Sequence, residues 1–265
     1  MTAAAAWRLD HAVVVVEALA PAVEAWRAAG FTLTPGGRHD ALPTENALVV
    51  FADGAYVELL AFRDAATAAD LGALAAGPRW QRHLQGLSAV ARRFLPRLVG
   101  PAGVADAALT GRPLARFAAE ARRRGVALAG PVPMARERPD GVRLAWELVL
   151  PAAPHVPFFI EDRTPRTLRV PADGPARTHR NGARGIAAVR VRVPDVAAAA
   201  LEMAALFDTA PAALPDGRAL VAAGSATFVI EAGEPAGPCG VDLAGVAALP
   251  AAFEAAGVRG ASPRE

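Results

Sequence analysis

The sequence predicts an α+β protein made of repeated β-α-β-β-β units. Three observations lead to this fold class. The same order of strand, helix and strand patterns recurs three times along 265 residues. The first two units each carry an Asp-Gly hairpin signal, at Asp53-Gly54 and at Asp140-Gly141. The length is sufficient for a large core in one domain or in two smaller ones.

The first unit is predicted over residues 1–64. Its opening strand, residues 8–16, alternates so that Leu9, His11, Val13 and Val15 share one face. Both faces of the second half are apolar, which predicts that the strand is covered on both sides. The rest of the unit follows in order: a helix over 21–30, a short strand over 31–34, a turn at Pro35-Gly-Gly37, and two strands over 46–51 and 55–62.

The second unit is predicted over residues 99–170, and its first strand, near 104–109, has a weak pattern. Its other elements are a helix over 113–124, an irregular strand over 126–134, and strands over 142–150 and 155–161. A third, reduced unit covers 185–265, and we expect residues 238–258 to supply its missing partner. Residues 65–98 form a helical insertion or lid, and residues 171–184 form a linker.

Composition excludes several classes of protein. All 28 basic residues are arginine, but they are interleaved with 26 acidic residues, so the sequence does not predict a nucleic-acid-binding protein. A single cysteine, Cys239, excludes an internal disulfide framework and a Cys-rich zinc site. The N-terminal segment Met1–Trp7 lacks the pattern of a signal peptide, and no apolar run approaches the length of a membrane span. We therefore expect a cytoplasmic protein that does not bind membranes.

Three side chains stand on apolar strand faces where a polar group is costly. His11 shares its face with valines, Glu58 lies between Tyr56 and Leu60, and Glu161 shares a face with Phe159. A buried carboxylate is expensive unless it is paired, protonated or bound to a cation. One histidine and two carboxylates suit Fe(II), Mn(II), Ni(II) or Zn(II). The other interpretation is a core histidine bonded to Glu58 or to a backbone carbonyl, with no ion.

Four further residues are candidates for contact with a substrate. Arg38, His39 and Asn46 surround the Gly-rich turn, where an arginine suits a carboxylate or phosphate. Trp146 is a candidate aromatic wall. The structural alternatives are hydrogen bonds within the turn for the first three residues and simple core packing for Trp146.

Several stretches together carry a resemblance to a known superfamily. They include Leu9-Asp-His-Ala-Val13, Thr34-Pro-Gly-Gly-Arg-His39, Asp53-Gly-Ala-Tyr-Val-Glu-Leu60, Val156-Pro-Phe-Phe-Ile-Glu161 and His179-Arg-Asn-Gly182. In order and spacing they resemble the vicinal oxygen chelate superfamily, and within it the glyoxalase-like domain family. The resemblance implies that the first two units form a cupped mixed sheet and the third packs beside them.

The resemblance also implies a divalent metal, held in the cup by the first and last strands of the paired units. His11 and Glu58 match the first unit and Glu161 matches the second. The fourth position has no histidine, and Asp106 is the nearest candidate. The implied function is a lyase, isomerase or dioxygenase that acts on a small oxygen-rich molecule, with Glu58 or Glu161 also serving as the base. The rival is a metal-free binding or sequestering protein of the resistance type. Superfamily cups are often completed by dimerisation, so a homodimer is a further expectation.

Overall fold

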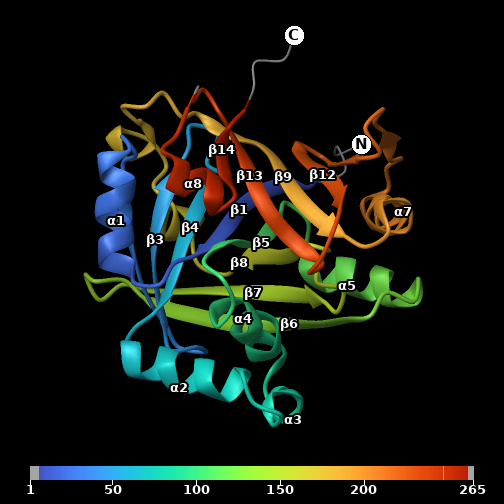
Figure 1. Ribbon diagram of the computed structural model, residues 1–265, viewed down its shortest axis with the longest axis horizontal. Helices are drawn as coiled ribbons and strands as arrows, with labels where there is room; N and C mark the ends of the chain where they lie inside the picture. Colours follow the sequence, from blue (N-terminus) through green and yellow to red (C-terminus); the bar gives the residue numbers. More distant parts are fainter. Residues whose placement is uncertain (1–5, 247, 262–265) are drawn as a thin grey trace.

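Two β-structures lie side by side in the chain (Figure 1). The computed structural model describes residues 6–246 and 248–261, so the start of the segment Met1–Trp7 lies outside the described residues. One β-structure is a closed barrel with the strand order β1-β4-β3-β2-β6-β7-β8-β5, and the other is a six-stranded sheet. The predicted fold class, α+β with repeated β-α-β-β-β units, is confirmed.

The barrel is built from the first two units, and each unit contributes four strands. The elements of the first unit are β1 (Arg8–Val15), α1 (Leu19–Ala28), β2 (Thr34–His39), β3 (Thr44–Val50) and β4 (Tyr56–Phe62). Those of the second are β5 (Gly103–Thr110), α5 (Leu114–Arg123), β6 (Leu128–Glu137), β7 (Arg143–Pro151) and β8 (Phe158–Asp162). Within each unit the first and last strands are parallel. Antiparallel pairing of β1 with β5 and of β2 with β6 joins the units and closes the barrel.

The remaining sheet contains the third unit and the C-terminal segment. Its elements are β9 (Gly185–Val193), α7 (Val196–Phe207), β10 (Ala212–Ala213), β11 (Ala219–Ala223), β12 (Ala226–Ala232), β13 (Gly237–Ala244), α8 (Ala251–Ala255) and β14 (Val258–Gly260). Strand β13 is antiparallel to β9, as β5 is to β1, and β14 is parallel to β13, as β8 is to β5. The C-terminal segment therefore occupies the position of a fourth unit. It contains the counterparts of the first strand, the helix and the last strand of such a unit.

Three helices connect the two barrel units and lie over and below β6 and β7 in the view of Figure 1. They are α2 (Ala65–Ala75), α3 (Trp80–Gln85) and α4 (Ala89–Leu98). Two short helical turns, α6 (Arg166–Arg169) and η1 (Pro175–Arg177), follow β8. None of the helices in the described residues is long and apolar enough to cross a membrane.

Strand β1 separates two hydrophobic cores. Ala12 and Val14 face an outer core that lies between the barrel and its surrounding helices and second sheet. Val13 and Val15 face an inner core within the barrel. All four side chains are buried, so the prediction of a strand covered on both sides is confirmed.

The predicted turn at residues 35–37 is wrong, because these residues belong to strand β2. Pairing of β2 with β3 shifts register between Pro35 and Gly37, and Gly36 lies at this irregularity. A Cβ atom at Gly36 would overlap Oδ1 of Asn46 on β3. The glycine is therefore needed for close approach to Asn46 rather than for a turn.

We predict that Gly36→Ala destabilises the protein by about 1–3 kcal/mol, the usual cost of forcing an extra methyl group into a packed site. The change also displaces the Asn46 side chain. The matched control is Gly72→Ala in α2, where a Cβ has no neighbour within 4 Å and where helix propensity predicts a gain of up to about 1 kcal/mol. Urea unfolding of both variants measures the difference, and equal stabilities would contradict the packing argument.

Candidate functional site

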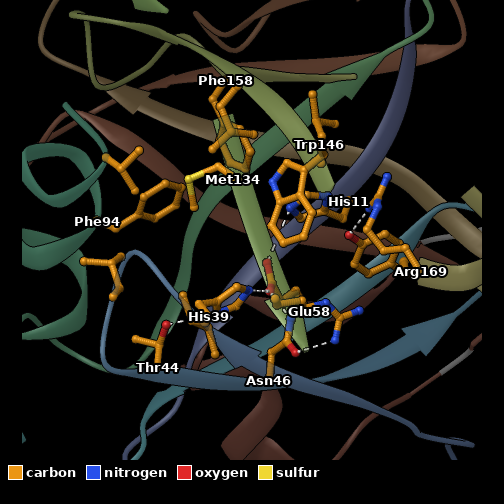
Figure 2. A pocket seen from close by; sticks show the side chains of 17 residues that line it. His11, His39, Thr44, Asn46, Glu58, Phe94, Met134, Trp146, Phe158 and Arg169 are labelled. Atoms are coloured by element: carbon orange, nitrogen blue, oxygen red, sulfur yellow. Dashed lines mark hydrogen bonds and ion pairs between the residues drawn. The ribbon is translucent and has the colours of Figure 1, made fainter. Parts of the chain in front are cut away.

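The interior of the barrel holds a small pocket (Figure 2). Its cavity measures about 60 Å³. Five of the sequence-predicted site residues line it together: His11, His39, Asn46, Glu58 and Trp146. They come from five different strands, β1, β2, β3, β4 and β7, so only the closed barrel brings them to one place.

The Glu58 carboxylate lies at the polar centre of this pocket. Its Oε2 atom is 3.4 Å from Nε2 of His11, and its Oε1 atom is 3.8 Å from Nε2 of His39. The Asn46 side-chain amide donates a hydrogen bond to Oε1. Glu58 is 9% exposed, so this largely buried carboxylate has two imidazoles and an amide as its polar neighbours.

His11 is held in position by the preceding residue. Its Nδ1 is 2.7 Å from Oδ1 of Asp10, and its ring stacks on Tyr56 with centroids 4.6 Å apart. An irregularity in the pairing of β1 with β5 falls between Leu9 and His11. It reverses the alternation of side chains, so Leu9 packs on the outer core while His11 points into the barrel. The prediction that these two residues share a face is therefore wrong.

Asp10 belongs to a buried network of charges beneath His11. Arg169 donates to Asp10 at 2.9 and 3.1 Å and to Asp162 at 2.7 and 2.8 Å, and Arg166 also donates to Asp10. Burial by itself raises the pKa of Asp10, but Arg169, His11 and Arg166 together hold it well below its usual value. Asp10 is therefore ionised and can only accept, so the hydrogen in the contact with His11 is on Nδ1.

This proton placement defines what His11 presents to the pocket. A neutral imidazole with its hydrogen on Nδ1 has a lone pair on Nε2. The 3.4 Å separation from Glu58 is also longer than a normal N–H···O hydrogen bond. In this neutral form, His11 Nε2 and Glu58 Oε2 are two acceptor atoms that face each other inside the barrel.

A second histidine stands on the other side of Glu58. Nδ1 of His39 is 3.0 Å from the Thr44 hydroxyl. Burial lowers the pKa of His39, an effect that the Glu58 charge opposes and Arg136 reinforces. His39 is therefore neutral near pH 7. It pairs in register with Arg136 of β6, whose guanidinium donates to Oδ1 of Asn46 at 3.2 Å.

Much of the remaining pocket wall is apolar. Its apolar side chains come mainly from the second unit and α4, with one each from β4 and the segment before β3: Leu42, Leu60, Val90, Phe94, Met134, Trp146, Leu148, Phe158 and Ile160. Helix α4 is fixed against the barrel because Arg93 binds the buried Asp106 carboxylate through two contacts of 2.8 Å. The pocket thus joins a polar centre from the first unit to an apolar half from the second.

Glu161 does not join this group. On β8 the residues that line the pocket are Phe158 and Ile160, while Phe159 packs in the outer core. Glu161 shares the face of Phe159, and its carboxylate accepts from the backbone N–H of Leu114 at 2.9 Å. Glu161 and Phe159 share a face, as predicted, but this face points away from the interior, so the predicted placement of Glu161 in the cup is wrong.

Arg38 and Asp106 also lie away from the polar centre. Arg38 is exposed and contributes to a different depression, between β2 and α1, because His39 takes the inward-facing position next to it. Asp106 is bound by Arg93 and, at 3.1 Å, by Arg97. It is therefore a structural anchor for α4 rather than a fourth ligand.

The donor set in the pocket does not match the predicted metal site. Within residues 6–246 and 248–261, no three His, Cys, Asp or Glu side chains are grouped so that they could hold a metal ion. His11 and Glu58 of the first unit face each other, but the second unit presents Phe158 and Ile160 where further ligands were expected. The half-site predicted from the first unit is therefore not completed by the second.

The sequence patterns did not identify four residues of the site: Asp10, which holds His11, and the pocket-lining residues Tyr56, Arg136 and Arg169. Asp10 precedes the candidate histidine, but alternation assigned it to the opposite face. Tyr56 shares the face of Glu58 on β4, so the alternation of this strand could have predicted that Tyr56 also lines the pocket. Arg136 follows the predicted irregular strand 126–134, and Arg169 lies at the end of the second unit. No local pattern separates them from the other arginines.

The fold and the site define a class of protein. A sequence model of the family described as "Glyoxalase-like domain" matches residues 9–207. The chain belongs to this glyoxalase-like domain family, which confirms the resemblance. No significant match was found among curated proteins.

Solved structures share the fold at low sequence identity. A hypothetical protein from Staphylococcus aureus is 16% identical, with a TM-score of 0.68 over 91% of this chain and 92% of the other. The Mn(II)-bound glyoxalase from Novosphingobium aromaticivorans is 11% identical, with a TM-score of 0.54 over 91% of this chain and 66% of the other. A 4-hydroxymandelate synthase from Streptomyces coelicolor is 15% identical, with a TM-score of 0.52 over 89% and 70%.

We predict that Asp10→Asn destabilises the protein by about 3 kcal/mol at pH 7, because it leaves buried arginine charge without its carboxylate. Since the pKa of Asp10 is depressed in the folded state, this stabilisation is present above about pH 4, the unfolded value, and is lost as pH falls through the lower folded value. The difference in the free energy of unfolding between wild type and Asp10→Asn should therefore become smaller below pH 4.

Urea unfolding between pH 7 and pH 2 measures this gap. The control is Asp40→Asn, which removes an exposed pair with Arg143 and should cost less than about 1 kcal/mol. A gap for Asp10→Asn that is no larger than the control, or that widens as pH falls, would contradict the assigned role of Asp10.

Proposed function

We propose that this protein is an enzyme that moves a proton on a small, oxygen-rich substrate bound inside the barrel, with Glu58 as the base. The proposal rests on one observation: Glu58 Oε2 and His11 Nε2 face each other at 3.4 Å in a largely apolar pocket. A positioned carboxylate can take a proton from a bound substrate, and an imidazole beside it can accept or return that proton, as in general acid–base catalysis. The membership of the glyoxalase-like family is in keeping with such a reaction, although fold alone does not assign it.

Glu58 is oriented for this role by its neighbours. Asn46 donates to Oε1, which leaves Oε2 directed towards His11 and the cavity. In the proposed step, a C–H bond next to a substrate carbonyl breaks and its proton passes to Glu58. The electron pair moves to the carbonyl oxygen and forms an enolate. Neutral His39 and the Asn46–Arg136 pair lie near Glu58 and supply hydrogen-bonding groups for substrate oxygens.

His11 acts as the second proton acceptor. Because Asp10 holds the hydrogen on Nδ1, Nε2 is free to accept a proton, and the Asp10 carboxylate stabilises the imidazolium that results. In this role His11 takes the proton from Glu58. It can then return the proton to Glu58 or deliver it to the substrate. The apolar wall formed by Trp146, Phe158 and Leu148 excludes water, which strengthens these electrostatic interactions.

A metal-dependent enzyme is the second candidate, and one specific observation favours it. A metal-binding histidine commonly donates its other ring N–H to a carboxylate, as His11 does to Asp10. Iron, manganese, nickel or zinc held by His11 and Glu58 would act as a Lewis acid on a substrate oxygen. Two protein ligands are fewer than the three that catalytic zinc sites use, so no step of the proposed reaction is assigned to a metal.

We predict that the wild-type protein catalyses exchange of carbon-bound hydrogen with solvent in at least one member of a panel of small 2-oxo acids, hydroxyketones and aldehydes in D₂O. Glu58→Gln should lower that rate about 10²- to 10⁴-fold, the usual contribution of general base catalysis. The matched control Arg38→Gln, outside the pocket, should leave it unchanged. Proton NMR follows the loss of each C–H signal.

Two outcomes would contradict the proposal. Exchange by Glu58→Gln at the wild-type rate would show that the base is another group. Compounds that bind in the pocket without any exchange would instead support the metal-free binding or sequestering protein.

Metal analysis separates the two enzyme candidates. After chelator treatment, we expect the wild-type protein to hold less than stoichiometric Fe, Mn, Ni or Zn and to keep its Glu58-dependent exchange. Stoichiometric uptake that is lost in His11→Ala but kept in Glu161→Gln, together with exchange that depends on the ion, would replace the first candidate with the second. Glu161→Gln is the control because Glu161 lies outside the pocket and its amide oxygen can still accept from Leu114.

A further inference from the structure

Arg136 is an unusual buried arginine. It is 2% exposed and lines the pocket from β6. Within the described residues, the hydrogen bond found for its guanidinium is the one to Asn46 Oδ1 at 3.2 Å, and no carboxylate oxygen lies within 4 Å of it. A guanidinium carries five N–H donors, so most of its capacity to bind an anion is not used by the protein.

Other buried arginines in the chain are satisfied by carboxylates. Arg93 binds Asp106 through two hydrogen bonds and also donates to two backbone carbonyls. Arg169 binds both Asp10 and Asp162. Burying a guanidinium without such a partner is costly. Arg136 differs from these two residues, and it is the one that stands beside Asn46 and Glu58 in the pocket.

One alternative is that Arg136 only balances the charge of Glu58. Asn46 lies between them, donating to Glu58 and accepting from Arg136, so the two charges do not meet directly. Charge balance across an amide leaves the remaining N–H donors of the guanidinium unmatched. Burial lowers the pKa of Arg136, opposed by Tyr56 and Glu58, which agrees with a guanidinium that lacks a direct counter-ion.

We propose that Arg136 binds a carboxylate group of the substrate, which makes the substrate a small carboxylic acid. The planar fork of the guanidinium matches a carboxylate through two parallel hydrogen bonds. Met134 and Trp146 provide apolar contact for the remainder of the molecule. This inference rests on the proposed function in placing the substrate in the same pocket, where a group bound by Arg136 is close to Glu58 through their shared neighbour Asn46.

The test uses pyruvate and its amide, pyruvamide, as probes of the same shape that differ in charge. Binding to the full chain is measured by isothermal titration or by saturation-transfer NMR. We expect the wild-type protein to prefer pyruvate by about tenfold to a hundredfold, the range for hydrogen bonds to charged groups. Arg136→Gln should abolish the preference, and Arg38→Gln, on the strand paired with β6, should retain it.

Three results would each overturn the inference. The wild type could bind the two probes equally, the preference for pyruvate could survive Arg136→Gln, or pyruvate could fail to bind at tens of millimolar. If Arg136→Gln does not fold, Arg136→Lys is the variant to measure. Lysine keeps the positive charge but lacks the planar fork of the guanidinium. It should weaken pyruvate binding about tenfold and leave pyruvamide binding unchanged. These measurements need no turnover. A failure of the proton-transfer proposal would therefore leave the pyruvate preference intact, and a failure of this inference would leave Glu58-dependent exchange intact.

Discussion

The buried Asp10 carboxylate is the interaction on which the site depends. It is completely inaccessible to solvent and ionised, so it must be matched by positive charge within the protein. Arg166 and Arg169 provide that charge from the segment that follows β8. The pairing fixes this segment against the first strand and, through the contact with Nδ1, fixes the ring of His11. Arg169, at the end of the second unit, therefore helps to fix the orientation of His11 in the first unit.

The two barrel units have diverged in what they contribute. The first places His11, His39, Asn46 and Glu58 in the interior, and the second places mainly aliphatic and aromatic side chains there, with Arg136 and Arg169 as the charged exceptions. A site with acid–base groups on one side and an apolar wall on the other suits a small molecule with a polar end. The same division explains why a metal site that needs ligands from both units is not assembled by the described residues.

Much of this arrangement follows from local sequence pattern. Alternation in β4 placed Glu58 with Tyr56 and Leu60, and all three line the pocket. Two kinds of information were missing. Alternation does not state which face of a strand is the interior, so Glu161 was assigned to the wrong side. Irregular pairing, as between Leu9 and His11 or at Gly36, reverses or shifts the alternation without a residue pattern that announces it. Long-range ion pairs such as Asp10 with Arg169 depend on barrel closure, which no local window contains.

The most direct test of this account is the location of the ring proton of His11, read from ¹⁵N NMR of the ligand-free protein near pH 7. If Asp10 holds the imidazole as described, Nδ1 carries a hydrogen, and in the neutral ring Nε2, which faces Glu58, carries none. A hydrogen on Nε2 with an unprotonated Nδ1 would contradict the account, because Asp10 would then not determine what His11 presents to the pocket.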